Sequence, residues 1–145
     1  MSRRSCTAAD HGSATVELTL VVPALVLVLG LLVAGGRIWF ARTTVTEAAQ
    51  TAARAASLAR TPDAAAANGR DAGRASLSTA GLRCADASVQ VQTGAFAVPV
   101  GTPATVRATA RCTVPLGDVL LPGLPGTLSL TGRGAAALDT YRSRE

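Results

Sequence analysis

An uninterrupted apolar run near the start of the chain dominates the pattern of hydrophobic and polar positions. Residues 18–36 carry no charged side chain and include one weakly polar residue, Thr19. A helix of this length spans about 28 Å, close to the ~30 Å hydrocarbon core of a bilayer. The run therefore predicts a retained membrane helix. The alternative is a removed secretory signal with a cleavage site at Val33-Ala34-Gly35, but the apolar region of such signals is shorter.

Beyond this run the pattern stays helical and then breaks. Residues 43–60 contain no Gly or Pro and are rich in Ala, the strongest helix former. Small apolar residues recur every three or four positions and form one narrow face, which consists of Ile38, Ala41, Val45, Ala48, Ala52, Ala55 and Ala59. This face predicts close packing, either on the protein's own sheet or on a helix of a neighbouring subunit. Residues 61–63 end the helix and start a second one over 63–79, which Gly69 and Gly73 weaken.

After the second helix the period changes from 3.6 to 2, which predicts β-strands. Residues 89–92 and 127–133 alternate apolar and polar positions, and residues 104–114 do so most clearly. The pattern predicts an α+β fold with an N-terminal membrane helix extended as a stalk, a second helix, and a small antiparallel sheet of three or four strands. The connection at 118–124 is apolar and predicts a flap over the core or a contact surface.

The three cysteines are distributed unevenly around the predicted membrane helix. Cys112 falls on the apolar face of a strand, and Cys84 follows the second helix, so a bridge between them would join the two layers. Two buried free thiols are the alternative. With only 3% aromatic residues the core is thin, and a bridge would stabilise it. Because disulfides persist in oxidising compartments, the pair places the C-terminal part outside the cell, with Cys6 on the other side.

Charge near the membrane helix points the other way. Arg3 and Arg4 precede the helix, whereas Arg37, Arg42 and Arg54 follow it, and arginine excess usually marks the cytoplasmic side. We give the cysteines more weight, because a helix inserted by a dedicated route tolerates three nearby arginines.

Composition excludes most chemistry. His11 is the single histidine, there is no Lys, and the acidic residues are singly spaced, so no catalytic residue, cofactor site or metal site is predicted. The net charge of +5 is carried by 14 scattered Arg. Without a basic cluster or aromatic stacking partners, these arginines do not predict nucleic-acid binding.

The junction ahead of the apolar run carries an acid, Glu17, which is costly next to lipid and needs a partner. If the chain is cut after Gly12, the new α-amino group of Ser13 is a cation. In a stack of identical helices this amine would neutralise Glu17 of a neighbour. The alternative is that Ser13 caps the helix and that Glu17 interacts with the helix dipole.

A basic leader, Gly12, an acid at the fifth position after it and a continuous apolar helix resemble the type IV prepilin signal. Together with the helix that follows, they are similar to the TadE-like group of the tight-adherence pilus system. Residues 12–17, 47–56 and 114–123 carry the resemblance. Leu18 departs from it, because many members have an aromatic residue there, but any apolar residue suffices for helix packing.

The resemblance implies a pilin-like minor pilin or pseudopilin that is not an enzyme. Its processing site would be Gly12–Ser13 and its assembly contact Glu17. Its partners would be a prepilin peptidase, the major pilin and other minor pilins, the membrane platform of the assembly machine and the lipid bilayer. The expected regions are a leader at 1–12, a transmembrane helix at 13–37, a helical stalk at 38–60 and an extracytoplasmic head at 61–145. An unprocessed single-pass anchor presenting a small interaction domain is the alternative.

Overall fold

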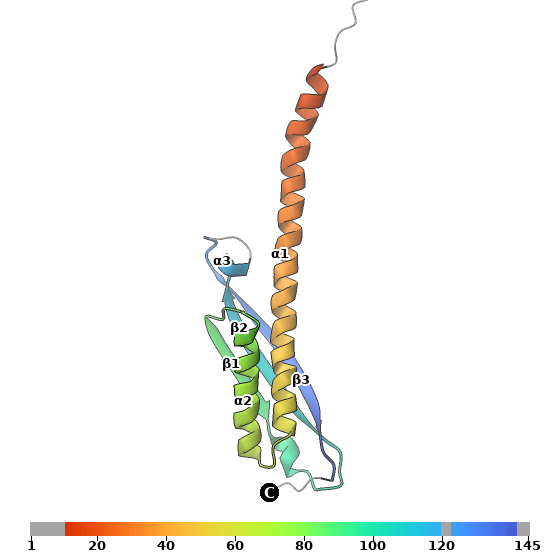
Figure 1. The fold of residues 1–145 in the computed structure, drawn as a ribbon, viewed down its shortest axis with the longest axis vertical. Coiled ribbons are helices and arrows are strands. Elements are labelled where there is room, and N and C mark those ends of the chain that lie inside the picture. The colour runs from red at the N-terminus through yellow and green to blue at the C-terminus, as the bar shows by residue number, and fades with distance from the viewer. Residues whose placement is uncertain (1–10, 120–122, 142–145) are drawn as a thin grey trace, which may run out of the picture. The chain divides into compact units, whose positions relative to one another are not determined.

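The computed structural model of the chain describes residues 11–119 and 123–141. Along the chain it contains α1 (His11–Ser57), α2 (Pro62–Thr79), β1 (Asp86–Gln92), the 3-10 helix η1 (Gly94–Ala97), β2 (Ala104–Pro115), α3 (Leu116–Val119) and β3 (Thr127–Leu138). These elements form two compact units, one up to Gly35 and one from Gly36 onward, and α1 contributes to both. The predicted α+β fold class is confirmed (Figure 1).

The first unit contains the apolar part of α1. Its large hydrophobic side chains are exposed along the whole segment from Leu18 to Val33. Pro23 lies inside α1 and does not interrupt it. Among the described residues, α1 is the one helix long and apolar enough to cross a membrane, judged by length and composition.

The second unit contains an antiparallel sheet with the strand order β1-β2-β3. The central strand β2 pairs Val89 with Ala110 on one side and Cys112 with Leu130 on the other. Burial along β2 alternates almost perfectly, because one face of the sheet packs on helices and the other is open. The three predicted strands are confirmed, and β1 and β3 are both longer than the alternating pattern indicated.

The second half of α1 packs on the sheet through small side chains. A stripe of α1 is almost completely buried, and it consists of Ala41, Val45, Ala48, Ala49, Ala52, Ala53 and Ala56. The alanine-rich face predicted from the sequence therefore contacts the protein's own sheet. Residues 38–57, expected as part of a stalk, supply the central helix of the second unit's core.

Two buried glycines of β3 set how closely α1 approaches the sheet. A Cβ atom at Gly132 would overlap the backbone carbonyl of Val45, and one at Gly134 would overlap that of Ala49. Because glycine has no Cβ, the helix backbone lies directly on the strand.

The second helix lies beside α1 on the same face of the sheet (Figure 1). Thr61 caps it by accepting a hydrogen bond from the Ala64 N–H, and Pro62 begins its first turn. Gly69 and Gly73, expected to weaken this helix, are both buried contact points. A Cβ at Gly69 would lie 2.7 Å from Val91 Cγ2, and one at Gly73 would lie 2.9 Å from Val89 Cγ1. Glycine lowers the helix propensity at these positions, but it allows α2 to pack closely against β1.

The core has two clusters of buried residues. The larger one joins the buried stripe of α1, apart from Ala56, to Leu77, Val89 and the inner face of β2. The smaller one contains Phe96, which is 8% exposed, together with Ala56, Ala65, Val106 and Leu138. Of the connection predicted as a flap or contact surface, residues 120–122 lie outside the described residues, and Leu124 is exposed.

Candidate functional site

The predicted processing and assembly residues lie at the start of α1. The backbones of Gly12, Ser13 and Glu17 are helical, while their side chains lie outside the described part of the structure. Residues 1–10 of the expected leader lie outside it as well. In a helix, positions 13 and 17 are one turn apart on the same side and separated by about 6 Å along the axis.

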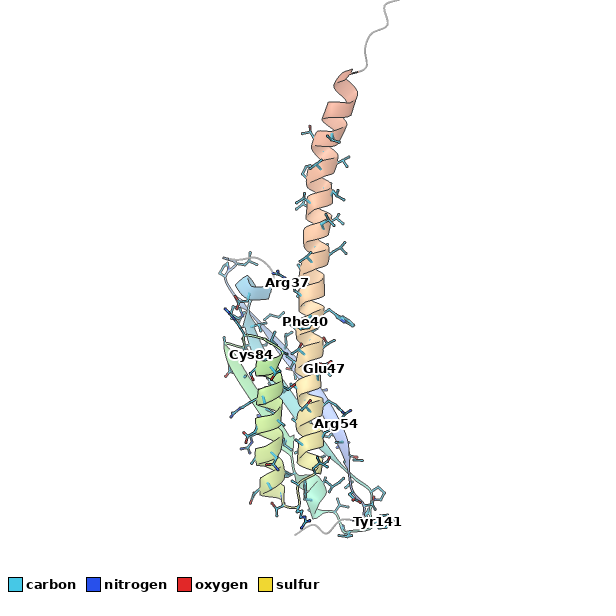
Figure 2. The ribbon with its side chains drawn as sticks, viewed as in Figure 1. Arg37, Phe40, Glu47, Arg54, Cys84 and Tyr141 are labelled. Carbon is cyan, nitrogen blue, oxygen red and sulfur yellow. A yellow bond between two sulfur atoms is a disulfide. The ribbon has the colours of Figure 1, made fainter. Side chains whose placement is uncertain are left out.

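The exposed surface of α1 changes character where the second unit begins. Trp39 is 72% exposed and Phe40 is 58% exposed, and the neighbouring Arg37 is exposed as well. Figure 2 labels Arg37 and Phe40 on α1. Aromatic residues next to a basic residue at the end of an apolar helix are typical of the membrane–water interface. A shallow depression of about 350 Å³ lies between Trp39, Arg42, Thr43, Thr46 and Glu47.

The predicted disulfide is present between Cys84 and Cys112, with a Cα–Cα distance of 5.3 Å. Cys84 lies in the connection from α2 to β1, and Cys112 is buried on the inner face of the central strand. The bridge therefore ties the end of the helical layer to the middle of the sheet, as expected (Figure 2 labels Cys84). Next to it, the Ala85 N–H donates a 2.7 Å hydrogen bond to the Thr113 carbonyl, which continues the β1–β2 ladder.

The role of Gln50 is not apparent from the sequence. Its side-chain Nε2 donates a 2.9 Å hydrogen bond to the Ala135 carbonyl, and its Oε1 accepts a 3.1 Å bond from the Ala135 N–H. The amide thus pairs with the outer edge of β3 as a neighbouring strand would. A polar residue adjoining the alanine face was the available signal, but its partner lies 85 positions away.

The arginines are scattered along the sequence, whereas the sheet brings three of them together. Arg107 and Arg111 of β2 and Arg133 of β3 all lie on the open face. The alternation of β2 placed its two arginines on one face, but the pairing register with β3 was needed to add the third. Among the described side chains, no three His, Cys, Asp or Glu gather as metal ligands do.

The layout defines a class: a pilin-like α+β protein with one apolar N-terminal helix, a second helix and a three-stranded antiparallel sheet. Residues 12–54 match the family model described as TadE-like protein, which confirms the resemblance predicted from the sequence. This is a structural, pilus-related family, and the match together with the apolar helix supports anchoring in a membrane.

The family match ends within α1, so residues 55–145 lie outside it. The resemblance expected at 114–123 therefore remains a prediction. Comparisons with curated proteins and with solved structures give no match.

Proposed function

We propose that this chain is a minor pilin or pseudopilin that takes part in assembling a tight-adherence, type IV-like pilus, and that a prepilin peptidase cuts it after Gly12. The observation that carries the proposal is the family match over 12–54, which begins at Gly12 and includes Ser13, Glu17 and the whole apolar helix. Gly12 in the first turn has low helix propensity, about 1 kcal/mol worse than Ala, so the turn opens at little cost for cleavage.

Glu17 is the assembly contact in this proposal. An acid in a membrane helix costs about 2.5–3.5 kcal/mol at the bilayer centre and less near the interface, so it needs a partner. After cleavage, the N-terminal α-amino group of a neighbouring pilin subunit, that of Ser13 where the neighbour is a second copy, supplies that partner. Neutralising the two charges lets the apolar helices of neighbouring subunits stack, which is the step that draws the subunit from the membrane toward the pilus base.

The second unit is extracytoplasmic in this proposal. The Cys84–Cys112 bridge supports that orientation, because disulfides persist in oxidising compartments. The partners are then the prepilin peptidase and the assembly platform at the membrane, and the major pilin and other minor pilins alongside α1.

The test of processing is the intact mass and N-terminal sequence of the membrane-extracted protein, produced with and without a prepilin peptidase. We expect a chain that begins at Ser13 only when the peptidase is present. Gly12→Val should block the cut, and Ser13→Ala should leave it intact. A second prepilin in the same cells reports that the peptidase is active. With that control positive, a chain beginning at Met1 overturns the proposal, and one beginning near Gly36 identifies a removed signal peptide.

The test of assembly compares Glu17→Gln with Glu47→Gln, a matched change at an exposed acid of the same helix. Both variants should still be cleaved. Cross-linking to the major pilin should fall at least about tenfold in Glu17→Gln, since the charge pair is lost, and stay unchanged in Glu47→Gln.

An unprocessed single-pass anchor, the second candidate function, is favoured by the membrane-capable helix alone. It predicts an intact leader and no effect of either variant.

A further inference from the structure

The open face of the sheet is mostly polar and is basic at its centre. It presents the residues that alternate with the buried ones, namely Asp86, Ser88, Gln90 and Gln92 of β1, Thr105, Arg107, Thr109, Arg111 and Thr113 of β2, and Ser129, Thr131, Arg133, Ala135 and Ala137 of β3. Pro115 and Thr127 continue the face at one end, and apart from Pro115 it carries no apolar side chain larger than Ala. The second half of α1 and α2 lie over the opposite face (Figure 1), so no described helix covers this surface.

Three arginines form a triangle at its centre. Arg107 and Arg111 lie four positions apart on β2, and Arg133 is paired with Thr109 between them. Strand geometry separates the first two by about 13 Å along the strand and puts each about 8 Å from the third. All three are exposed and line a depression of about 550 Å³, together with Gln90, Gln92 and Thr131.

The charge of this triangle is not compensated within the described part of the chain. None of the three guanidinium groups forms an ion pair with a described carboxylate. Asp86, the one acid of the face, lies at its end, opposite Thr113. On α2, by contrast, arginines and acids alternate within one helix, as at Arg70 and Asp71. The sheet face therefore carries a net positive charge, as does α1, where Arg37, Arg42 and Arg54 outnumber Glu47.

We propose that this face binds an extended acidic polypeptide segment of another protein, with Asp or Glu at alternate positions. In an extended chain, side chains at i, i+2 and i+4 point to one side at intervals of about 6.7 Å, which matches the three arginines along the strand direction. Arg binds carboxylates through two parallel hydrogen bonds, and Thr and Gln around it bind backbone groups.

Other polyanions fit this face less well. It has no aromatic side chain on which the bases of a single-stranded nucleic acid could stack. It has no large apolar side chain to enter a lipid interface. A second copy of the same face would bring like charges together. The inference does not rest on the proposed function, because an uncleaved anchored protein presents the same face.

The test is binding of a fluorescent ten-residue peptide of alternating Glu and Thr to the full chain in nonionic detergent, followed by anisotropy. A peptide of the same composition with its five Glu contiguous is the spacing control. The face variant changes Arg107, Arg111 and Arg133 to Gln. The matched variant changes Arg54, Arg70 and Arg74 to Gln, which removes the same charge from exposed helix positions.

We expect the alternating peptide to bind several-fold more tightly than the contiguous one. The face variant should weaken binding at least about tenfold and the matched variant less than about threefold, since direct pairs outweigh long-range charge. Replacing the three face arginines with Lys keeps the positive charge but removes the planar guanidinium group that forms two parallel hydrogen bonds. This variant should bind the peptide less tightly than the parent and more tightly than the Gln variant. Circular dichroism and thiol counting establish that each variant is folded.

Three results would overturn the assignment. Equal losses in the face and matched variants would mean that net charge alone attracts the peptide. Unchanged binding in the face variant would exclude the arginine triangle. Tighter binding of single-stranded DNA, polygalacturonate or anionic vesicles, lost in the face variant, would assign the face to a different polyanion.

Discussion

At the scale of single residues, two glycines of β3 allow the helix and the sheet to form one compact layer pair. Gly132 and Gly134 lie under the carbonyls of Val45 and Ala49, where any side chain would meet helix backbone. Backbone atoms cannot rotate away as a side chain can, so the space is fixed by the fold.

Gly134→Ala should therefore destabilise the second unit strongly. Overpacking a core typically costs about 1–3 kcal/mol, and we expect the upper end or more here because the displaced atoms belong to α1 itself. The control is Gly94→Ala, since a Cβ at Gly94 meets nothing within 4 Å. It should change the free energy of unfolding by less than about 1 kcal/mol, in the stabilising direction. Denaturant unfolding of both variants in detergent measures the difference, and equal midpoints would contradict this packing.

At the scale of elements, Gln50 links α1 to the free edge of β3. Its amide makes hydrogen bonds of 2.9 and 3.1 Å to the carbonyl and N–H of Ala135. Exposed strand edges invite pairing with other chains, and a helix side chain that occupies edge groups limits this. The contact also holds the register between helix and strand.

Gln50→Ala should cost about 1 kcal/mol, because two hydrogen bonds are lost but water can reach the exposed Ala135. Gln50→Glu keeps an acceptor for the Ala135 N–H and loses the donor to its carbonyl, so it should protect the Ala135 amide better than Gln50→Ala does. Hydrogen exchange at Ala135 reports this order. Gln92→Ala, at an exposed position of the open face, should leave the exchange unchanged. Identical exchange in all four proteins would refute the role of Gln50.

The elements could be predicted where their environment produces a regular pattern of apolar and polar residues. The alternation along β2 and the uninterrupted apolar run of α1 are such patterns, and both elements were predicted. The end of β3 was missed because Gly132 and Gly134 interrupt the apolar pattern where the helix presses closest. Gly69 and Gly73 likewise read as weak points, since their partners on β1 and α1 are distant in the chain. Periodicity within an element can be recognised in the local sequence, whereas contacts between elements that are distant in the chain cannot.

At the scale of the whole molecule, a thin core is combined with one covalent tie. The buried stripe of α1 is almost all Ala, so each contact buries little apolar area, and Phe96 is the one buried aromatic residue among those described. The Cys84–Cys112 bridge closes a loop with a sequence separation of 28. In the chain-entropy account such a loop contributes roughly 3–4 kcal/mol, a large share of the stability of a small domain.

Changing both Cys84 and Cys112 to Ser should therefore lower the free energy of unfolding by roughly 3–4 kcal/mol and leave the second unit partly unfolded at physiological temperature. Cys6→Ser, which leaves the bridge intact, is the control and should unfold as the parent does. Thermal and denaturant unfolding with and without dithiothreitol measure the loss of stability. Dithiothreitol should destabilise the parent by the same amount and should have no effect on the double variant, which has no bridge to reduce. The same result bears on orientation, because a unit that needs its disulfide to fold must reach an oxidising compartment. If the reduced and double-variant proteins unfold like the parent, the bridge is dispensable, and the main support for an extracytoplasmic second unit is lost.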